Sequence, residues 1–186
     1  MRKFLYTVWE IAEVFLIAIL AVAAIKYFLV QPFIVNGASM EPTFYDGDYL
    51  LVDEISYRFQ APQRGDVIVF HSPMDYSVYF IKRVIGLPGE TVDVEGDKVK
   101  ITNAQHPEGF YLTEPYLSPA MSTGWVGSKK ITLGPTQYFT MGDNRLNSLD
   151  SRYWGPLERS AIVGVVRARL WPLNRLDVFD HITYAN

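Results

Sequence analysis

Residues 79–85 read YFIKRVI and place a lysine in the middle of an apolar run typical of a β-strand. Successive side chains of a strand point to opposite faces, so Phe80, Lys82 and Val84 share one face. Between two apolar side chains, loss of hydration lowers the pKa of the lysine from its ordinary value of about 10.4. A fall of roughly 2 to 3 pH units would make the amine a base at neutral pH. Alternatively, the stem of Lys82 lies along the sheet and its ammonium reaches water.

A serine with no evident histidine partner precedes this strand. It is Ser39, in the stretch GASMEPTF of residues 37–44. A serine hydroxyl is a poor nucleophile until a base removes its proton, and a desolvated lysine can be that base. The histidines of the chain are His71, His106 and His181. They are far apart in the sequence, and nothing beside them supports a Ser-His-Asp triad or a metal site. Ser39 and Lys82 are therefore the candidate pair.

A third stretch, MGDNRLNSLDSR, covers residues 141–152. By itself it predicts a solvated polar loop, because its Gly-Asp-Asn start favours turns. In register with GASMEPTF, RGDVIVF and YFIKRVIGLPGE, however, it closely resembles the bacterial type I signal peptidases. The members of this family are membrane-anchored serine–lysine endopeptidases that remove signal peptides from exported proteins. The resemblance runs from the apolar N-terminal segment to about Trp171.

The resemblance implies that Ser39 is the nucleophile and Lys82 the general base. Some members carry a serine two residues before the nucleophile, and its hydroxyl helps to bind the oxyanion. Here that position is Gly37. The backbone N–H of Ser39 would be one donor, and the second would be an N–H made accessible by Gly37 or a water. Such a donor can contribute about 3–4 kcal/mol to transition-state binding.

The third stretch would support this pair. Ser148 matches a serine whose hydroxyl holds the lysine of the family in position. Asp150 and Arg152 match a paired acid and base that brace the loop, and Asp143 matches an acidic residue nearby. The chemistry needs no metal and no cofactor.

The expected substrate is the signal peptide of an exported pre-protein, cut after small residues at the first and third positions before the scissile bond. An extended peptide could add as a strand between Ile34-Val35-Asn36 and Tyr79-Phe80-Ile81. By resemblance, Met40, Phe44 and Phe80 line the shallow pocket for the first of these small residues. Ordinary core packing is the alternative interpretation of these three side chains.

An apolar run, IAEVFLIAILAVAAIKYFLV, covers residues 11–30. Twenty helical residues measure about 30 Å, the thickness of the hydrocarbon layer of a bilayer. We therefore expect a single-pass protein of the cell membrane, with residues 1–10 in the cytoplasm, 11–30 as the transmembrane anchor, and 31–186 as an extracytoplasmic peptidase domain. Arg2 and Lys3 favour a cytoplasmic N-terminus. A cleavable signal peptide ending near Ala21-Val22-Ala23 is the alternative, but the apolar run continues past these residues.

Beyond the anchor, the sequence predicts a mainly antiparallel β fold. The expected strands cover residues 49–52, 67–70, 79–85, 91–94, 98–101, 138–141 and 161–170. The resemblance implies the two-sheet, strongly coiled fold of the family, with an irregular insertion at about 102–134. The chain has 186 residues, a net charge of −3 and no cysteine, which excludes disulfides and thiolate sites and gives no basic surface for nucleic acid. Its oligomeric state stays open.

Two other functions are compatible with parts of the sequence. A serine–lysine autoprotease of the SOS-repressor type would share the pair and a related fold, but it should carry a DNA-binding helix-turn-helix or a self-cleavage segment before the serine, where this chain has the apolar segment expected to be a membrane helix. An inactive, membrane-anchored module could keep only the peptide groove. Such a module would be expected to have lost Ser39 or Lys82, and both are present.

Overall fold

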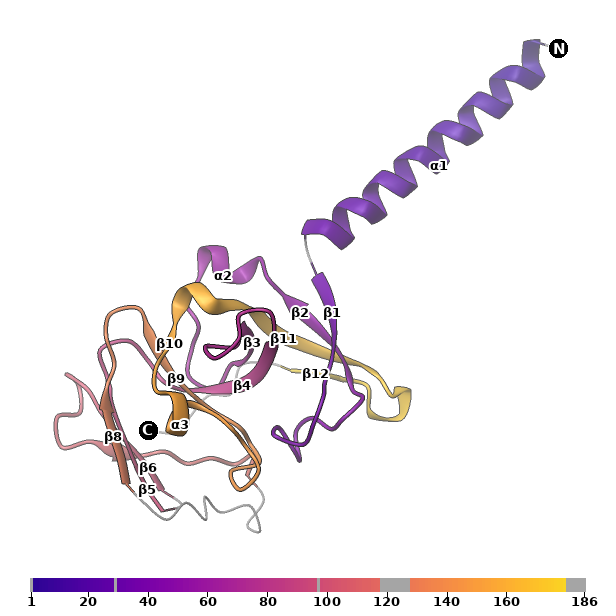
Figure 1. The fold of residues 1–186 in the computed structure, drawn as a ribbon. Coiled ribbons are helices and arrows are strands. Elements are labelled where there is room, and N and C mark those ends of the chain that lie inside the picture. Colours follow the sequence, from indigo (N-terminus) through magenta and orange to yellow (C-terminus); the bar gives the residue numbers. More distant parts are fainter. Residues whose placement is uncertain (1, 29, 97, 118–127, 180–186) are drawn as a thin grey trace.

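The computed structural model describes residues 2–28, 30–96, 98–117 and 128–179 (Figure 1). Its helical elements are α1 (Arg2–Phe28), α2 (Ser56–Phe59) and α3 (Ser151–Trp154), with the short 3₁₀ helices η2 (Arg159–Ala161) and η3 (Leu173–Arg175). The strands are β1 (Val30–Ile34), β2 (Tyr49–Asp53), β3 (Val67–His71), β4 (Tyr79–Gly86), β5 (Thr91–Glu95), β6 (Lys98–Thr102), β7 (Phe110–Tyr111), β8 (Ser128–Thr132), β9 (Gln137–Met141), β10 (Leu157–Glu158), β11 (Ile162–Trp171) and β12 (Asp177–Val178).

The strands form two antiparallel sheets. The larger has the order β1-β2-β11-β3-β4-β9-β10, with β12 paired to β11, and the smaller has the order β7-β6-β5-β8. The predicted mainly β, two-sheet fold is thereby confirmed, and each predicted strand segment forms a strand. The insertion at 102–134 is less irregular than expected, because β7 and β8 lie within it and pair with β6 and β5.

The helix α1 projects away from the β-rich body, and β1 follows it (Figure 1). The predicted anchor segment, residues 11–30, lies mostly within α1, which ends at Phe28, and Val30 pairs with Asp53 of β2. Among the residues described, no helix combines the length and the apolar character that crossing a membrane requires.

The strand β4 runs between β3 and β9, and its residues from Lys82 to Gly86 are all buried. A side chain at Gly86 would overlap the side chains of Val92, in the smaller sheet, and of Leu133, the residue that follows β8. The absence of a Cβ there lets the two sheets pack closely. The interior is filled by apolar side chains such as Ile85, Phe139 and Met141. The strand that carries the lysine is therefore held on both sides.

Candidate active site

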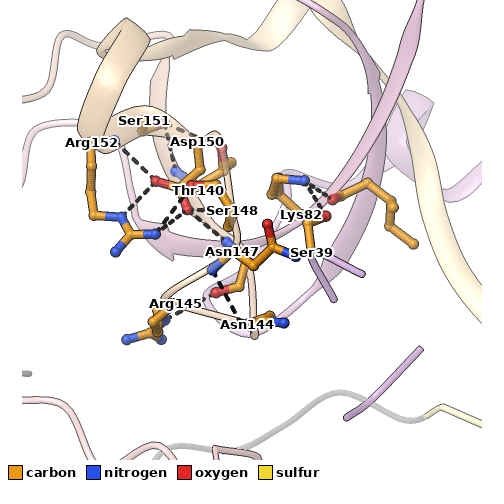
Figure 2. Close-up of polar contacts among 12 residues, drawn as sticks. Ser39, Lys82, Thr140, Asn144, Arg145, Asn147, Ser148, Asp150, Ser151 and Arg152 are labelled. Atoms are coloured by element: carbon orange, nitrogen blue, oxygen red, sulfur yellow. Dashed lines mark hydrogen bonds and ion pairs between the residues drawn. The ribbon is translucent and has the colours of Figure 1, made fainter. Parts of the chain in front are cut away.

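Ser39 and Lys82, which are 43 positions apart in the sequence, meet at the middle of β4 (Figure 2). Lys82 Nζ lies 2.8 Å from Ser39 Oγ and donates a second hydrogen bond of 2.8 Å to the carbonyl of Ile81. The lysine is only 4% exposed, while Ser39 is partly exposed. The two groups are thus within reach of a direct proton transfer.

Burial determines the protonation of this lysine. Loss of hydration lowers the pKa of Lys82 from 10.5 to about 8, and the carboxylates of Asp150 and Asp143 oppose this fall. A group with this pKa is partly neutral near pH 7 to 8, so it can accept a proton there and return it later. This is the range that a general base for a serine hydroxyl requires.

The backbone around Ser39 is fixed by Asn144, a residue to which the sequence analysis gave no role at the site. The Asn144 backbone N–H donates to the carbonyl of Ser39 at 3.1 Å, and its side-chain amide donates to the carbonyl of Ala38 at 3.0 Å. Its place in the Gly-Asp-Asn turn predicted a turn, but the partners 105 and 106 positions away could not be read from the sequence. Asn144 therefore ties the third stretch to the serine loop.

The two expected oxyanion donors differ in availability. The Gly37 N–H, in a residue with φ of 89°, already donates to Asp46 Oδ1 at 2.7 Å. The Ser39 N–H donates no hydrogen bond to any residue that the structure describes. In this structure the Ser39 N–H is available to hydrogen-bond to an oxyanion, whereas the Gly37 N–H is already bonded to Asp46.

Asp150 organises the third stretch. Its carboxylate accepts two hydrogen bonds of 2.8 Å from the Arg152 guanidinium, one of 3.0 Å from the Gly142 N–H and one of 2.7 Å from the Ser148 hydroxyl (Figure 2). It also caps α3 by accepting from the Arg152 N–H. The acid and base expected to pair are therefore together. Ser148, in contrast, donates to Asp150, whereas the resemblance implied a contact with Lys82.

Asp143 has a partner that the sequence analysis did not assign to the site, Arg83. Its two carboxylate oxygens accept from Arg83 at 2.8 and 2.6 Å, and the Thr43 hydroxyl donates to it at 2.6 Å. Arg83 is 2% exposed, and its guanidinium lies 3.9 Å from the centre of the Tyr116 ring. This buried pair joins β4 to the third stretch and, through Tyr116, to the insertion.

A second buried pair also ties the insertion to the third stretch. Arg145 Nη1 donates to Glu114 Oε2 at 3.0 Å, and Arg145 Nε donates to the carbonyl of Gly142 at 3.0 Å. The side chains of Arg145 and Glu114 are 0% and 6% exposed. The segment around Glu114 is thus a structural support of the site, although it lies outside the three stretches.

A cavity of about 210 Å³ opens beside Ser39 and Lys82. It is lined by Phe33, Ile34, Val35, Asn36, Ser39, Leu50, Val69, Tyr79, Phe80, Ile81, Lys82 and Leu149. Both segments expected to hold a peptide are on this wall. Met40 and Phe44 are not, because each is 0% exposed in the core behind Val35 and Leu50. Leu149 is a wall residue that the sequence analysis did not single out.

Two unpaired strand edges border this cavity. The strand β1 lies at the end of the larger sheet and, among the strands that the structure describes, pairs only with β2. Residues 79–82 of β4 pair with β3, while the pairing of β4 with β9 begins at Arg83. Backbone N–H and C=O groups that pair with no neighbouring strand of the described chain therefore flank the cavity on two sides, which suits an extended peptide, although the Ile81 carbonyl already accepts from Lys82 Nζ.

Neither His71 nor His106 lines this cavity. The His71 ring stacks on Tyr76, and its Nδ1 lies 2.7 Å from the carbonyl of Tyr76. His106 lies 3.7 Å from Glu108, and His181 is outside the described residues. Within the described part of the chain, no three histidine, aspartate or glutamate side chains gather as metal ligands would.

Comparison with known proteins gives a consistent result. The family model described as "Signal peptidase, peptidase S26" matches residues 8–171. A signal peptidase I of Leptolyngbya laminosa is 38% identical over 86% of this chain and 78% of its own length. Signal peptidase I T of Bacillus subtilis is 35% identical over 94% of this chain and 91% of its own. A solved signal peptidase I of Enterococcus faecalis is 34% identical, with a TM-score of 0.48, and covers 57% of this chain and 97% of its own. The chain belongs to the signal peptidase family, peptidase S26.

Proposed function

We propose that Ser39 and Lys82 are the nucleophile and the general base with which this peptidase removes signal peptides from exported pre-proteins. The observation that supports the pair most is the 2.8 Å separation of Lys82 Nζ and Ser39 Oγ at the wall of the cavity. The depressed pKa of Lys82 supports it independently, since a lysine with its ordinary pKa would be protonated at neutral pH.

In the reaction, neutral Lys82 removes the proton of Ser39 while Oγ attacks the carbonyl carbon of the scissile bond. The C–O bond forms, and the carbonyl oxygen becomes an oxyanion that the Ser39 N–H stabilises. The protonated lysine gives its proton to the leaving amine as the C–N bond breaks. A water, deprotonated by the neutral lysine, then hydrolyses the ester by the reverse route.

The second oxyanion donor depends on Asp46. The Gly37 N–H can donate to an oxyanion only after this carboxylate releases it. The variant Asp46→Ala frees the N–H. A higher kcat in this variant would identify Gly37 as the second donor, and an unchanged kcat would favour a water in that position.

The substrate segment before the cut adds as a strand between Ile34-Val35-Asn36 and Tyr79-Phe80-Ile81. The free edges of β1 and of the first half of β4 supply backbone hydrogen bonds to it. The cavity of about 210 Å³ between these edges is small and lined mainly by apolar side chains, which agrees with small side chains before the scissile bond.

The helix α1 anchors this peptidase in the cell membrane as a single pass, with residues 1–10 in the cytoplasm and the β-rich domain outside it. The run at 11–30 supports the anchor, and so do the side chains of Phe15, Leu16 and Ile17, which are 66%, 58% and 59% exposed. Consecutive residues of a helix point about 100° apart, so these three side chains make more than one face of α1 apolar here. Membrane fractionation and protease accessibility in intact cells test this topology. A protected or soluble C-terminal domain would contradict it.

Cleavage of a model pre-protein by the full-length protein in detergent tests the catalytic pair. We expect Ser39→Ala and Lys82→Met each to abolish cleavage, and the double variant to be no worse than either, because the two residues act as one unit. The exposed Ser77, which lies outside the cavity, supplies the matched control Ser77→Ala. Normal cleavage by Lys82→Met would refute the pair. An inactive peptide-binding module would bind the signal peptide without cutting it, even as wild type.

A further inference from the structure

Leu149 occupies an unusual position in the wall of the cavity. Its neighbours in the chain, Ser148 and Asp150, are 8% and 0% exposed and hydrogen-bond to each other. Leu149 itself is 46% exposed and lines the cavity beside Ser39 and Lys82. A rigid backbone thus presents an apolar side chain to whatever enters the cavity.

The packing of Ser148 shows at which end of the cavity Leu149 lies. A Cβ on Gly142 would overlap both the Ser148 hydroxyl and the carbonyl oxygen of Ser39. Both groups therefore lie against Gly142 and close to each other. Leu149 follows Ser148 directly and therefore lies at the end where the scissile bond must be. Tyr79, in contrast, is three residues before Lys82 on β4, about 10 Å farther along the strand.

We propose that Leu149 selects the first residue after the scissile bond. This inference rests on the proposed function, in which the strand edges at Ile34-Val35-Asn36 and Tyr79-Phe80-Ile81 hold the residues before the cut. The peptide must then leave the groove past Ser39, where the third stretch supplies the wall. A half-exposed leucine there gains contact with a small or apolar side chain and takes water from a charged one.

A charge substitution gives the sharpest test, because it should reverse a preference and not merely weaken binding. Two peptides are compared that differ only in glutamate or lysine directly after the cut. We expect Leu149→Lys to raise the kcat/KM ratio of the glutamate peptide to the lysine peptide roughly fivefold, the effect of one exposed ion pair, and Leu149→Glu to lower it similarly. Each ratio is taken within one variant, so an effect on the pKa of Lys82 cancels.

Leu146 provides the matched control. It is in the same loop and 63% exposed, but it is not on the cavity wall. Leu146→Lys should leave the ratio at the wild-type value. Equal ratios in Leu146→Lys and Leu149→Lys would overturn the proposal, and so would a change of preference that appears only at the residue before the cut. If wild type cuts neither of the two peptides nor a reference peptide, the proposed function itself fails.

Discussion

Lys82 and Arg83 follow each other on β4, and these two buried cations have opposite kinds of partner. The Arg83 guanidinium is held by the carboxylate of Asp143 at 2.8 and 2.6 Å, whereas Lys82 Nζ meets the hydroxyl of Ser39 at 2.8 Å. The positive charge of Arg83 is neutralised by a carboxylate in direct contact with it. The carboxylates that stabilise the charge of Lys82, those of Asp150 and Asp143, lie farther away. The fold thereby keeps Arg83 charged and lowers the pKa of Lys82, as the proposed general base requires.

Replacing the lysine should stabilise the protein at neutral pH. The pKa of Lys82 is about 8 in the folded state and 10.5 ordinarily, so below pH 8 the folded state carries the cost of a buried ammonium. This cost, up to about 3 kcal/mol, is relieved as the pH rises from 8 to 10.5, because the folded state loses the proton first. We expect Lys82→Met to unfold at a higher urea concentration than wild type at pH 7, with the advantage shrinking by pH 10. A constant difference across this range would contradict a depressed pKa.

Removing Asp143 should change both the stability of the protein and the pKa of Lys82, and the two effects can be measured separately. Asp143→Ala leaves the buried charge of Arg83 without this carboxylate, so we expect a loss of about 3–5 kcal/mol in the free energy of unfolding. Asp143 also raises the pKa of Lys82, so its loss should lower that pKa further and move the alkaline rise of kcat/KM to lower pH. Urea unfolding and a pH profile measure the two effects. A profile that moves to higher pH would show that Asp143 does not act on Lys82 as a charge.

The sequence predicted the strands well, because alternating apolar residues between turn signals report directly on a half-buried sheet. It also identified Ser39 and Lys82, which the structure places in hydrogen-bonding distance. Their catalytic roles stay a prediction. The partners of Ser148 and Arg83 could not be obtained in this way. Each partner is determined by which side chain lies on the other side of a loop or a sheet. Neither the spacing of apolar residues nor a short sequence motif carries this information.

Buried and exposed members of one motif are equally hard to distinguish from sequence. Met40 and Phe44 follow Ser39 closely and were expected at the pocket, yet both are fully buried in the core. Leu149 stands in a polar stretch and lines the cavity. Glu114 lies in a segment that the sequence predicted to be irregular. Its partner, Arg145, is 31 positions away in the sequence.

Glu114 should be needed for the stability of the third stretch. Glu114→Ala leaves the fully buried Arg145 without its carboxylate, and breaking such a pair costs about 3–5 kcal/mol. We expect a large fall in the urea midpoint. Glu108 supplies the control, since its side chain is 72% exposed and Glu108→Ala should change the midpoint little. Equal midpoints for the two variants would show that the Arg145 pair is not a support.

Gly142 should tolerate no side chain. A Cβ there would overlap the Ser148 hydroxyl and the Ser39 carbonyl, so Gly142→Ala must displace the nucleophile or the third stretch. We expect a fall in kcat of about a hundredfold, since small displacements of reacting groups have effects of this order. Gly134→Ala is the control, because its Cβ would meet only the flexible Gln137 side chain. Wild-type kcat in Gly142→Ala would show that the loop can move aside freely.

The state of the Lys82 amine tests the catalytic pair most directly. NMR of the full-length protein with ¹³C-labelled lysine Cε, in detergent, follows the titration of each lysine, and the Lys82→Met spectrum assigns the signal. We expect Lys82 to titrate with a pKa of about 8, and kcat/KM to rise with pH through the same value. A Lys82 signal that titrates near its ordinary value of 10.5, or a pH profile without a step near 8, would contradict a general-base role for this residue.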